Sequence, residues 1–198
     1  MDKRLVLVDI DNYLIRNSLQ LNQFALQNLF KIKFRLNIWK KIQYEETDSF
    51  IFQKICQTFQ LNLSTEQLSN LKRDYVLELF KLIKNNRNSA QLDPISYNNI
   101  KELLEQKIII GSFASSFFDN IRMKLIPLNI FHHFQFGAFG EDATSVTQLI
   151  EVAKEILKIQ TKETFSETYY LSEKNYKVKD IQWLNNNTLG SILQKKEF

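Results

Sequence analysis

Two aspartates near the N-terminus, Asp9 and Asp11, have the spacing and the setting of a chemically active pair. They follow the apolar residues 5–8, a run too short for a helix, which is predicted as a strand buried on both faces, as in a parallel sheet. Two carboxylates there suit a hard cation such as Mg²⁺. They also suit covalent catalysis, in which one attacks phosphorus and the other acts as general acid and base. The alternative is that both residues only cap a turn at the strand end.

The other reactive side chains favour fewer kinds of chemistry. Cys56 is the single cysteine, so a disulfide framework or a thiolate metal site within one chain is excluded. It lies in an apolar stretch and is predicted as a small core residue. The two histidines are the adjacent pair His132 and His133, which disfavours a cysteine–histidine nucleophile and is interpreted as structural or exposed.

Composition indicates a globular chain with one domain, or one domain that carries an insertion. The 198 residues are 44% hydrophobic, which is enough to form a core. The net charge of +4 is scattered, with no basic stripe, which argues against nucleic-acid binding. No signal peptide and no run long enough to span a membrane is visible, so we expect a cytoplasmic protein.

Residues 18–88 read as a helical block, with three or four amphipathic segments and no clear strand. One of these segments opens with Ser64 and has Gln67 three residues later, which is a capping-box pattern. The polar residues 84–91 are predicted as a linker that ends the block.

Helices and strands alternate after this block. Asp93 and Pro94 mark a helix start, and Thr144 or Ser145 marks another, while a further helix is expected over residues 115–125. Strands are predicted within residues 107–113, 133–140 and 167–172, with a possible last one at 188–193. This order predicts an α/β fold with a parallel sheet, and a helical insertion that packs over the carboxyl edge of the strands, where ligands bind.

The stretch "LVLVDIDNYLI" resembles the first motif of the haloacid dehalogenase (HAD) superfamily, four apolar residues followed by D-x-D-G-T-L. "LDPISYNNIKELLEQKIIIGSFASS" and "KLIPLNIFHHFQFGAFGEDA" are similar to its phosphoglycolate-phosphatase-like branch. The resemblance covers nearly the whole chain. It implies a Rossmann-like HAD core with a parallel sheet at residues 1–17 and 89–198, and an inserted all-α cap at 18–88.

The resemblance also implies roles for the first-motif residues. Asp9 matches the nucleophile, and Asp11 matches the general acid and base. Mg²⁺ would be held by the Asp9 carboxylate and the Asp11 backbone carbonyl, with Glu173 as a further ligand after a later strand. Asn12 and Tyr13 stand where the family has Gly and Thr.

The second and third motifs depart further from the family. An ungapped match places Ala114 where a phosphate-binding hydroxyl belongs, so Ser112, Ser115 or Ser116 would have to supply it. The family's third motif brings a cation, and Lys154 is the nearest substitute for it in this chain.

Three functions follow as hypotheses. The first is a magnesium-dependent phosphatase that hydrolyses a phosphomonoester through an aspartyl-phosphate on Asp9, with a small phosphorylated molecule favoured over a protein substrate. The second is a degenerate HAD-fold protein that binds a ligand or partner without catalysis. The third is a phosphoprotein phosphatase acting on phosphotyrosine. Convergence of Asp9, Asp11 and Glu173 on one cation site favours the enzyme, and a lysine in the metal position favours the binding protein.

Overall fold

The computed structural model describes residues 3–38, 46–85, 90–106, 108–134 and 136–190. Its centre is a parallel sheet with the strand order β5-β4-β1-β6-β7. The strands are β1 (Lys3–Asp9), β4 (Ile109–Phe113), β5 (Gly137–Ala138), β6 (Phe165–Leu171) and β7 (Gln182–Leu184). The predicted α/β fold with a parallel sheet is therefore confirmed.

The central strand is β1, and its four residues from 5 to 8 are fully buried, as its unbroken apolar run predicts. It pairs with β4 on one side and with β6 on the other. Asp9 lies opposite Phe113 of β4, and Val8 lies opposite Leu171 of β6. The carboxyl ends of these three strands therefore meet at one edge of the sheet.

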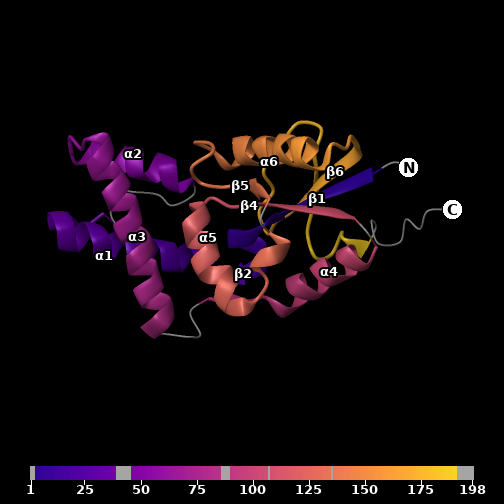
Figure 1. The fold of residues 1–198 in the computed structure, drawn as a ribbon, viewed down its shortest axis with the longest axis horizontal. Helices are drawn as coiled ribbons and strands as arrows, with labels where there is room; N and C mark the ends of the chain where they lie inside the picture. Colours follow the sequence, from indigo (N-terminus) through magenta and orange to yellow (C-terminus); the bar gives the residue numbers. More distant parts are fainter. Residues whose placement is uncertain (1–2, 39–45, 86–89, 107, 135, 191–198) are drawn as a thin grey trace.

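Helices cover both faces of the sheet (Figure 1). One face packs against α6 (Val146–Thr161), and the other against α4 (Pro94–Glu105) and α5 (Phe118–Leu125). The apolar residues that α6 buries against the sheet are Val146, Leu149, Ile150, Ala153 and Leu157. Those that α4 and α5 bury are Ile100, Leu103, Ile121 and Leu125. Two short 3₁₀ turns, η2 (Ile126–Leu128) and η3 (Phe131–His133), follow α5.

Three helices lie together at one end of the molecule, next to the carboxyl edge of the sheet (Figure 1). They are α1 (Ser18–Phe34), α2 (Asp48–Thr58) and α3 (Thr65–Asn85), and we call them the helical insertion. An antiparallel pair that the sequence did not predict, β2 (Ile15–Arg16) with β3 (Gln91–Leu92), joins them to the rest of the chain.

Helix caps explain where several of these helices begin. Ser64 and Gln67 form the predicted capping box, because each backbone N–H donates to the other's side chain, at 2.8 and 3.2 Å. Asp93 caps α4, and Ser145 rather than Thr144 caps α6. These predicted helix starts are confirmed.

The last strand lies earlier than the sequence predicted. It is β7, whereas Thr188 and Leu189 belong to a turn, and residues 191–193 lie outside the described part of the chain. The turn forms because the Asn185 side chain accepts the N–H groups of Asn187 and Thr188, at 2.9 and 3.0 Å. Of the predicted linker, residues 84–85 end α3, residue 91 begins β3, and 86–89 lie outside the described part.

Among the described residues, no helix is both long enough and apolar enough to cross a membrane.

Candidate active site

A short π-helical turn, η1 (Ile10–Leu14), follows β1 and sets the directions of both aspartates. Asp9 is the N-cap of this turn, and its Oδ1 accepts the Asn12 N–H at 3.0 Å. The exposed fractions of Asp9 and Asp11 are only 1% and 3%. Their side chains find different partners, so the pair divides into two sites that share one turn.

Asp9 faces the end of β6. Its Oδ2 accepts hydrogen bonds from the Ser172 hydroxyl at 2.7 Å, the Asn12 side-chain amide at 3.1 Å and the Tyr176 hydroxyl at 3.5 Å. Burial raises the pKa of Asp9 from an ordinary 3.8 to about 6, although the Ser172 hydrogen bond opposes the change. The negative charge of Asp11 adds to the rise. Asp9 is therefore mostly ionised at neutral pH, but less completely than an exposed aspartate.

Asp11 faces α5 and the segment that precedes it. Its Oδ1 pairs with the Lys124 ammonium at 3.1 Å and accepts the Ser18 hydroxyl at 2.5 Å. Its Oδ2 accepts the Ser116 N–H at 2.9 Å and the hydroxyls of Ser116 and Ser115 at 2.6 and 3.1 Å. Burial by itself raises the pKa of Asp11, but Lys124 and the serine donors outweigh it and hold the pKa below its ordinary value.

The partner that sequence reasoning missed is Lys124. Its side chain is fully buried, and its ammonium also donates to the hydroxyls of Ser18 and Ser116, at 2.8 and 3.3 Å. One signal was available. Lys124 comes three residues after the core residue Ile121, so it occupies the buried face of an amphipathic helix, where an apolar side chain is the rule.

The predicted hydroxyl donors separate into two groups. Ser115, with its neighbour Ser116, reaches Asp11, as described above. Ser112 is buried in β4, and its hydroxyl donates to the carbonyls of Phe134 and Phe136 at 3.3 and 3.1 Å. β5 approaches Ser112 so closely that a Cβ on Gly137 would lie 1.9 Å from the Ser112 carbonyl oxygen. The hydroxyl of Ser112 therefore serves the packing of two strands in this structure.

Lys154 and Glu173 lie apart from the buried pair. Lys154 is half-buried on α6, and no hydrogen bond or ion pair joins it to another described residue. Glu173 follows Ser172 directly but is exposed. Among the described residues, no group of three or more Asp, Glu, His or Cys side chains is placed to hold a metal ion. The donor set in this conformation thus falls short of a Mg²⁺ site.

Tyr13, in the place of the family's threonine, points away from both carboxylates. Its hydroxyl donates to the Asn186 side chain at 2.6 Å and accepts the Asn99 amide at 3.0 Å. The ring is buried on the α4 side of the turn, so it leaves the surroundings of Asp9 uncrowded.

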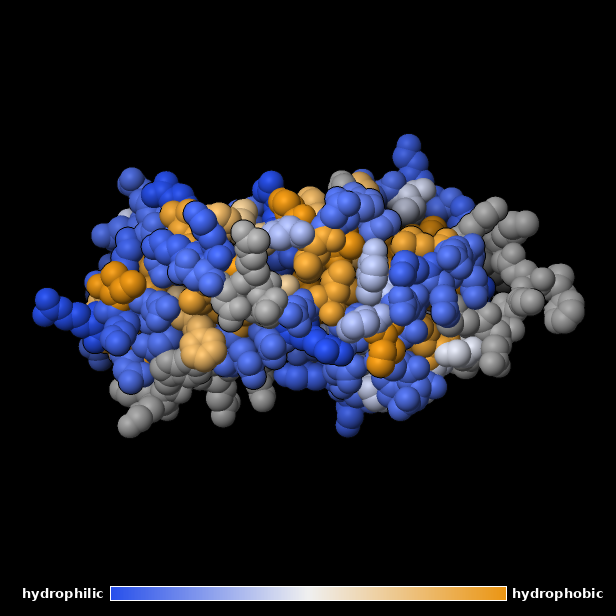
Figure 2. Space-filling view, turned by 90° about the horizontal axis from the view of Figure 1, so that it is seen from below, coloured by the Kyte–Doolittle hydropathy of each residue, from blue (hydrophilic) through white to orange (hydrophobic). Residues whose placement is uncertain are grey.

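Two of the hollows that border the helical insertion also reach α5, and neither is lined by Asp9 or Asp11. The first, of about 330 Å³, lies between α3 and the start of α5 and includes Lys72, Arg73 and Phe117. The second, of about 670 Å³, lies between α3, α5 and η2 and is mainly apolar, with Phe80 and Leu128 in its lining. Apolar side chains gather in the middle of the face seen from below (Figure 2). Lys124, which pairs with Asp11, is also part of the lining of the second hollow.

Comparison with known proteins identifies the fold. No protein-family model matches the sequence. No curated protein matches it either. Among solved structures, CbbY from Rhodobacter sphaeroides in complex with phosphate has a TM-score of 0.62 at 12% identity, over 86% of this chain and 77% of that one.

Two further structures support the same assignment. A predicted phosphoglycolate phosphatase from Haemophilus somnus has a TM-score of 0.61 at 15% identity, over 86% of this chain and 77% of that one. A haloacid dehalogenase-like hydrolase from Streptococcus pneumoniae has a TM-score of 0.55 at 14% identity, over 98% and 99% of the two chains. At these identities the likeness concerns the fold alone, and it agrees with the fold that the motif resemblance implied.

Proposed function

We propose that the protein is a HAD-type phosphatase that hydrolyses a phosphomonoester, with Asp9 as the nucleophile. The observation that carries the proposal is the setting of Asp9 at the carboxyl end of the central strand, where ligands bind in α/β folds. Its oxygens are oriented by the Asn12 N–H and the Ser172 hydroxyl, and its pKa of about 6 leaves it ionised at neutral pH. An oriented, ionised carboxylate at this edge suits attack on phosphorus.

The proposed reaction has two steps. An Asp9 oxygen forms a bond to phosphorus while the ester P–O bond breaks, and the leaving oxygen takes a proton. Water then attacks the aspartyl-phosphate, which releases inorganic phosphate and restores the Asp9 carboxylate. The resemblance assigns both proton transfers to Asp11. Because Lys124 and the serines stabilise the ionised form of Asp11, we propose that it must exchange some of these partners before it can carry a proton.

Lys124 is the proposed source of positive charge in place of Lys154. It is buried within 3.1 Å of Asp11, whereas Lys154 has no contact with either aspartate among the described residues. A buried cation beside the reaction centre offsets the negative charge that a phosphate brings.

Helices α1–α3 are proposed as the cap of this enzyme, in line with the expected cap at residues 18–88. Because Asp9 and Asp11 are 1% and 3% exposed, a substrate can reach them only if the insertion moves relative to the sheet. A small phosphorylated molecule is the proposed substrate class. CbbY has been crystallised with phosphate and with xylulose-(1,5)bisphosphate, which supports this class by analogy of fold.

The proposed requirement for magnesium rests only on the resemblance to the HAD superfamily. The Asp9 carboxylate, the Asp11 backbone carbonyl and Glu173 would hold it, and it would offset charge on the transferring phosphoryl group. Because these groups do not form a metal site in the described conformation, neither step of the proposed reaction depends on it.

A second candidate function is favoured by one observation. Lys124 forms an ion pair with Asp11, whereas a general acid and base needs a carboxyl that is free to exchange protons. Both aspartates are also buried from solvent. A degenerate HAD-fold protein that binds a ligand or partner without catalysis accounts for this arrangement directly. No observation of the described residues favours the alternative of a phosphotyrosine phosphatase.

Hydrolysis of p-nitrophenyl phosphate tests the proposal, with and without Mg²⁺. We expect turnover by the wild type and its loss in Asp9→Asn. Asp119→Asn is the matched control, because its side chain is 59% exposed and, within the described part of the chain, forms an ion pair with Arg122 of the same helix. If the wild type is inert on several classes of phosphate ester while folded, the binding function replaces the enzyme. Equal turnover by wild type and Asp9→Asn would remove Asp9 as the nucleophile.

A further inference from the structure

The first turn of α2 is hydrogen-bonded to two loops at the carboxyl edge of the sheet. The Asp48 N–H donates to the Ser115 carbonyl at 2.8 Å, and the Ser49 N–H donates to the Gly140 carbonyl at 3.2 Å. A Cβ on Gly140 would lie 2.2 Å from the Ser115 carbonyl oxygen, so glycine is needed where the two loops meet. The helical insertion is thus docked through backbone groups, which fixes the position of α2 closely.

The side chain of Asp48 adds a second set of bonds at the same place. Its Oδ2 accepts the Phe117 N–H at 2.9 Å and the Asn120 amide at 3.1 Å. Its Oδ1 accepts the Tyr75 hydroxyl from α3 at 3.3 Å. Asp48 is 4% exposed. One buried carboxylate therefore connects α2, α3 and the start of α5, and none of the reaction steps proposed above uses it.

The segment of residues 115–117 is held from both sides. On one side Asp11 accepts the Ser115 hydroxyl and the Ser116 N–H and hydroxyl. On the other side Asp48 accepts the Phe117 N–H and donates its own N–H to the Ser115 carbonyl. A shift of this segment at one carboxylate should therefore move it at the other, because both sets of contacts fall within the same three residues.

We propose that Asp48 is a positioning residue. It couples docking of the helical insertion to the hydrogen bonds that Ser115 and Ser116 donate to Asp11. While α2 is docked, Ser115 and Ser116 are held on Asp11. When the charged Asp48 carboxylate moves to solvent, the segment is released. This coupling depends only on the hydrogen bonds around the two aspartates, so it does not require that the protein hydrolyses a phosphomonoester.

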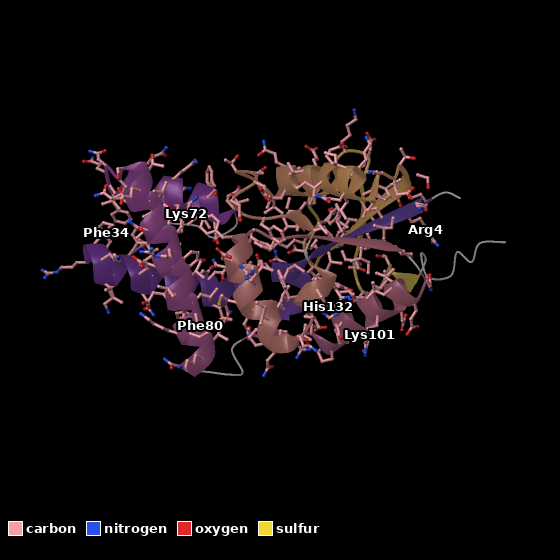
Figure 3. The ribbon with its side chains drawn as sticks, viewed as in Figure 1. Arg4, Phe34, Lys72, Phe80, Lys101 and His132 are labelled. Atoms are coloured by element: carbon pink, nitrogen blue, oxygen red, sulfur yellow. The ribbon has the colours of Figure 1, made fainter. Side chains whose placement is uncertain are left out.

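The charge of Asp48 opposes docking. Burial raises the pKa of Asp48 to about 7, and the Phe117 N–H bond only partly offsets it. Among the described residues, Tyr75 from α3, Asp11 from η1 and Lys124 from α5 act on Asp48. Lys72 from α3 and Glu141 from the loop after β5 contact the neighbouring residues 117 and 118. Asp11 raises its pKa and Lys124 lowers it. Lys72, labelled in Figure 3, lies 4.9 Å from the centre of the Phe117 ring that covers this site.

The direction of the pH effect follows from linkage. An undocked Asp48 in solvent has an ordinary pKa near 3.8, and the docked form has a pKa of about 7. The docked state therefore binds the proton more tightly, so docking is strongest below about pH 4 and weakens as pH rises to about 7, by up to tenfold per pH unit. Above about pH 7 both states are ionised and the effect levels off.

Amide hydrogen exchange at Ser116 and Phe117 tests the coupling, read residue by residue and corrected for the intrinsic pH dependence. Between pH 5.5 and 7.5 we expect the opening constant of both wild-type amides to rise on the order of tenfold. In Asp48→Asn, which keeps an acceptor but has no charge, the rise disappears. Asp119→Asn, which changes an exposed acid in the first turn of α5, should behave as the wild type does. The same pH response in Asp48→Asn and the wild type would overturn the proposal.

Asp48→Ala tests the positioning role separately, because it removes the acceptor of the Phe117 N–H. We expect both amides to lose protection together, at pH 5.5 as well as at pH 7.5. If the Phe117 amide loses protection while the Ser116 amide, which donates to Asp11, keeps it, then Asp48 only anchors its own helix and the coupling is refuted. Should Asp48→Ala fail to fold, the comparison of Asp48→Asn with the wild type still decides. The readout needs no turnover, so an inert protein would leave this result unaffected.

Discussion

The Asp11 carboxylate accepts five hydrogen bonds, and the charged donor among its partners is Lys124. The pair is fully enclosed, so neither charge is screened by water. Burying two charges is expensive, and their attraction only offsets that cost when the remaining donors and acceptors are satisfied. Here Ser18 and Ser116 complete the set around both groups. Removing either charge should therefore be far worse than removing both.

Lys124→Met tests this balance. It leaves the buried Asp11 charge uncompensated, so we expect the free energy of unfolding to fall by about 3–5 kcal/mol at pH 7, measured by urea denaturation. Lys158→Met is the control and should change it by less than about 1 kcal/mol, because the Lys158–Glu155 pair is exposed. Adding Asp11→Asn to Lys124→Met should recover part of the loss. A double variant that is as unstable as the sum of the two single variants would contradict the pairing.

The carboxyl of Asp9 predicts a pH-dependent stability of opposite sign to that of a salt-bridged acid. Its folded pKa of about 6 lies above the ordinary 3.8, so its contribution to stability is present below about pH 4 and is lost as pH rises through about 6. Asp9→Asn should then be more stable than the wild type at pH 8, by up to about 3 kcal/mol, and no more stable at pH 4. Denaturation curves at both pH values measure this. Equal gains at the two pH values would point to packing instead of charge.

At the scale of elements, the short strand β5 and the turn η1 determine which side chains reach the site. η1 turns the chain after β1 so that two carboxylates one residue apart face different partners. β5 is only two residues long, yet it pairs closely with β4 at the edge of the sheet, because Gly137 has no side chain to prevent the approach. This contact also occupies the Ser112 hydroxyl, which is bonded to the chain just before β5.

Gly137→Ala tests the seating of β5. The added methyl would lie 1.9 Å from the Ser112 carbonyl oxygen, which is backbone and unable to rotate away. We expect a loss of about 3 kcal/mol in the free energy of unfolding. Gly190→Ala is the matched control, since a Cβ there meets nothing within 4 Å, and it should be close to neutral. Similar effects of the two changes would mean that β5 does not depend on this close approach.

At the scale of the whole molecule, the helical insertion lies next to the carboxyl edge of the sheet (Figure 1), and both aspartates at that edge are buried. The chain crosses between the two parts at β2 and β3, where an ion pair of 2.7 Å joins Arg16 to Asp93. These crossings lie beside η1, so the insertion can move without breaking the sheet. Opening is therefore expected to precede any reaction at Asp9.

Beryllofluoride, an analogue of the phosphoryl group, tests this order of events in the presence of Mg²⁺. If opening must come first, the rate of its reaction at Asp9 should level off at high concentration, and Asp48→Ala should raise that plateau. Fluorescence of Trp183 is a suitable reporter, because its indole N–H donates to the Ser172 carbonyl at 2.9 Å. The Ser172 hydroxyl in turn donates a hydrogen bond to Asp9. A rate that stays proportional to concentration throughout would show that the site is already accessible.

Much of the fold could be predicted from the sequence because its causes are local. The unbroken apolar run of β1 indicated a buried parallel strand, and Ser64, Asp93 and Ser145 marked helix starts through bonds to residues three positions away. Asp9 and Asp11 stood out because charges at the end of such a strand need a reason. The β2–β3 pair and the position of β7 were missed, since two or three residues carry too little periodicity to be recognised.

The surroundings of the aspartates were decided by tertiary structure alone. Lys124 lies 113 positions from Asp11 in the sequence, and Phe117 lies 69 from Asp48, so no local spacing connects them. The choice of Ser115 over Ser112 depended on where β4 ends and on the close approach of β5. The sequence by itself determined that two carboxylates stand at the end of a buried strand, because strand length and residue order are local. Which groups they meet there depends on how distant loops and helices pack against that edge.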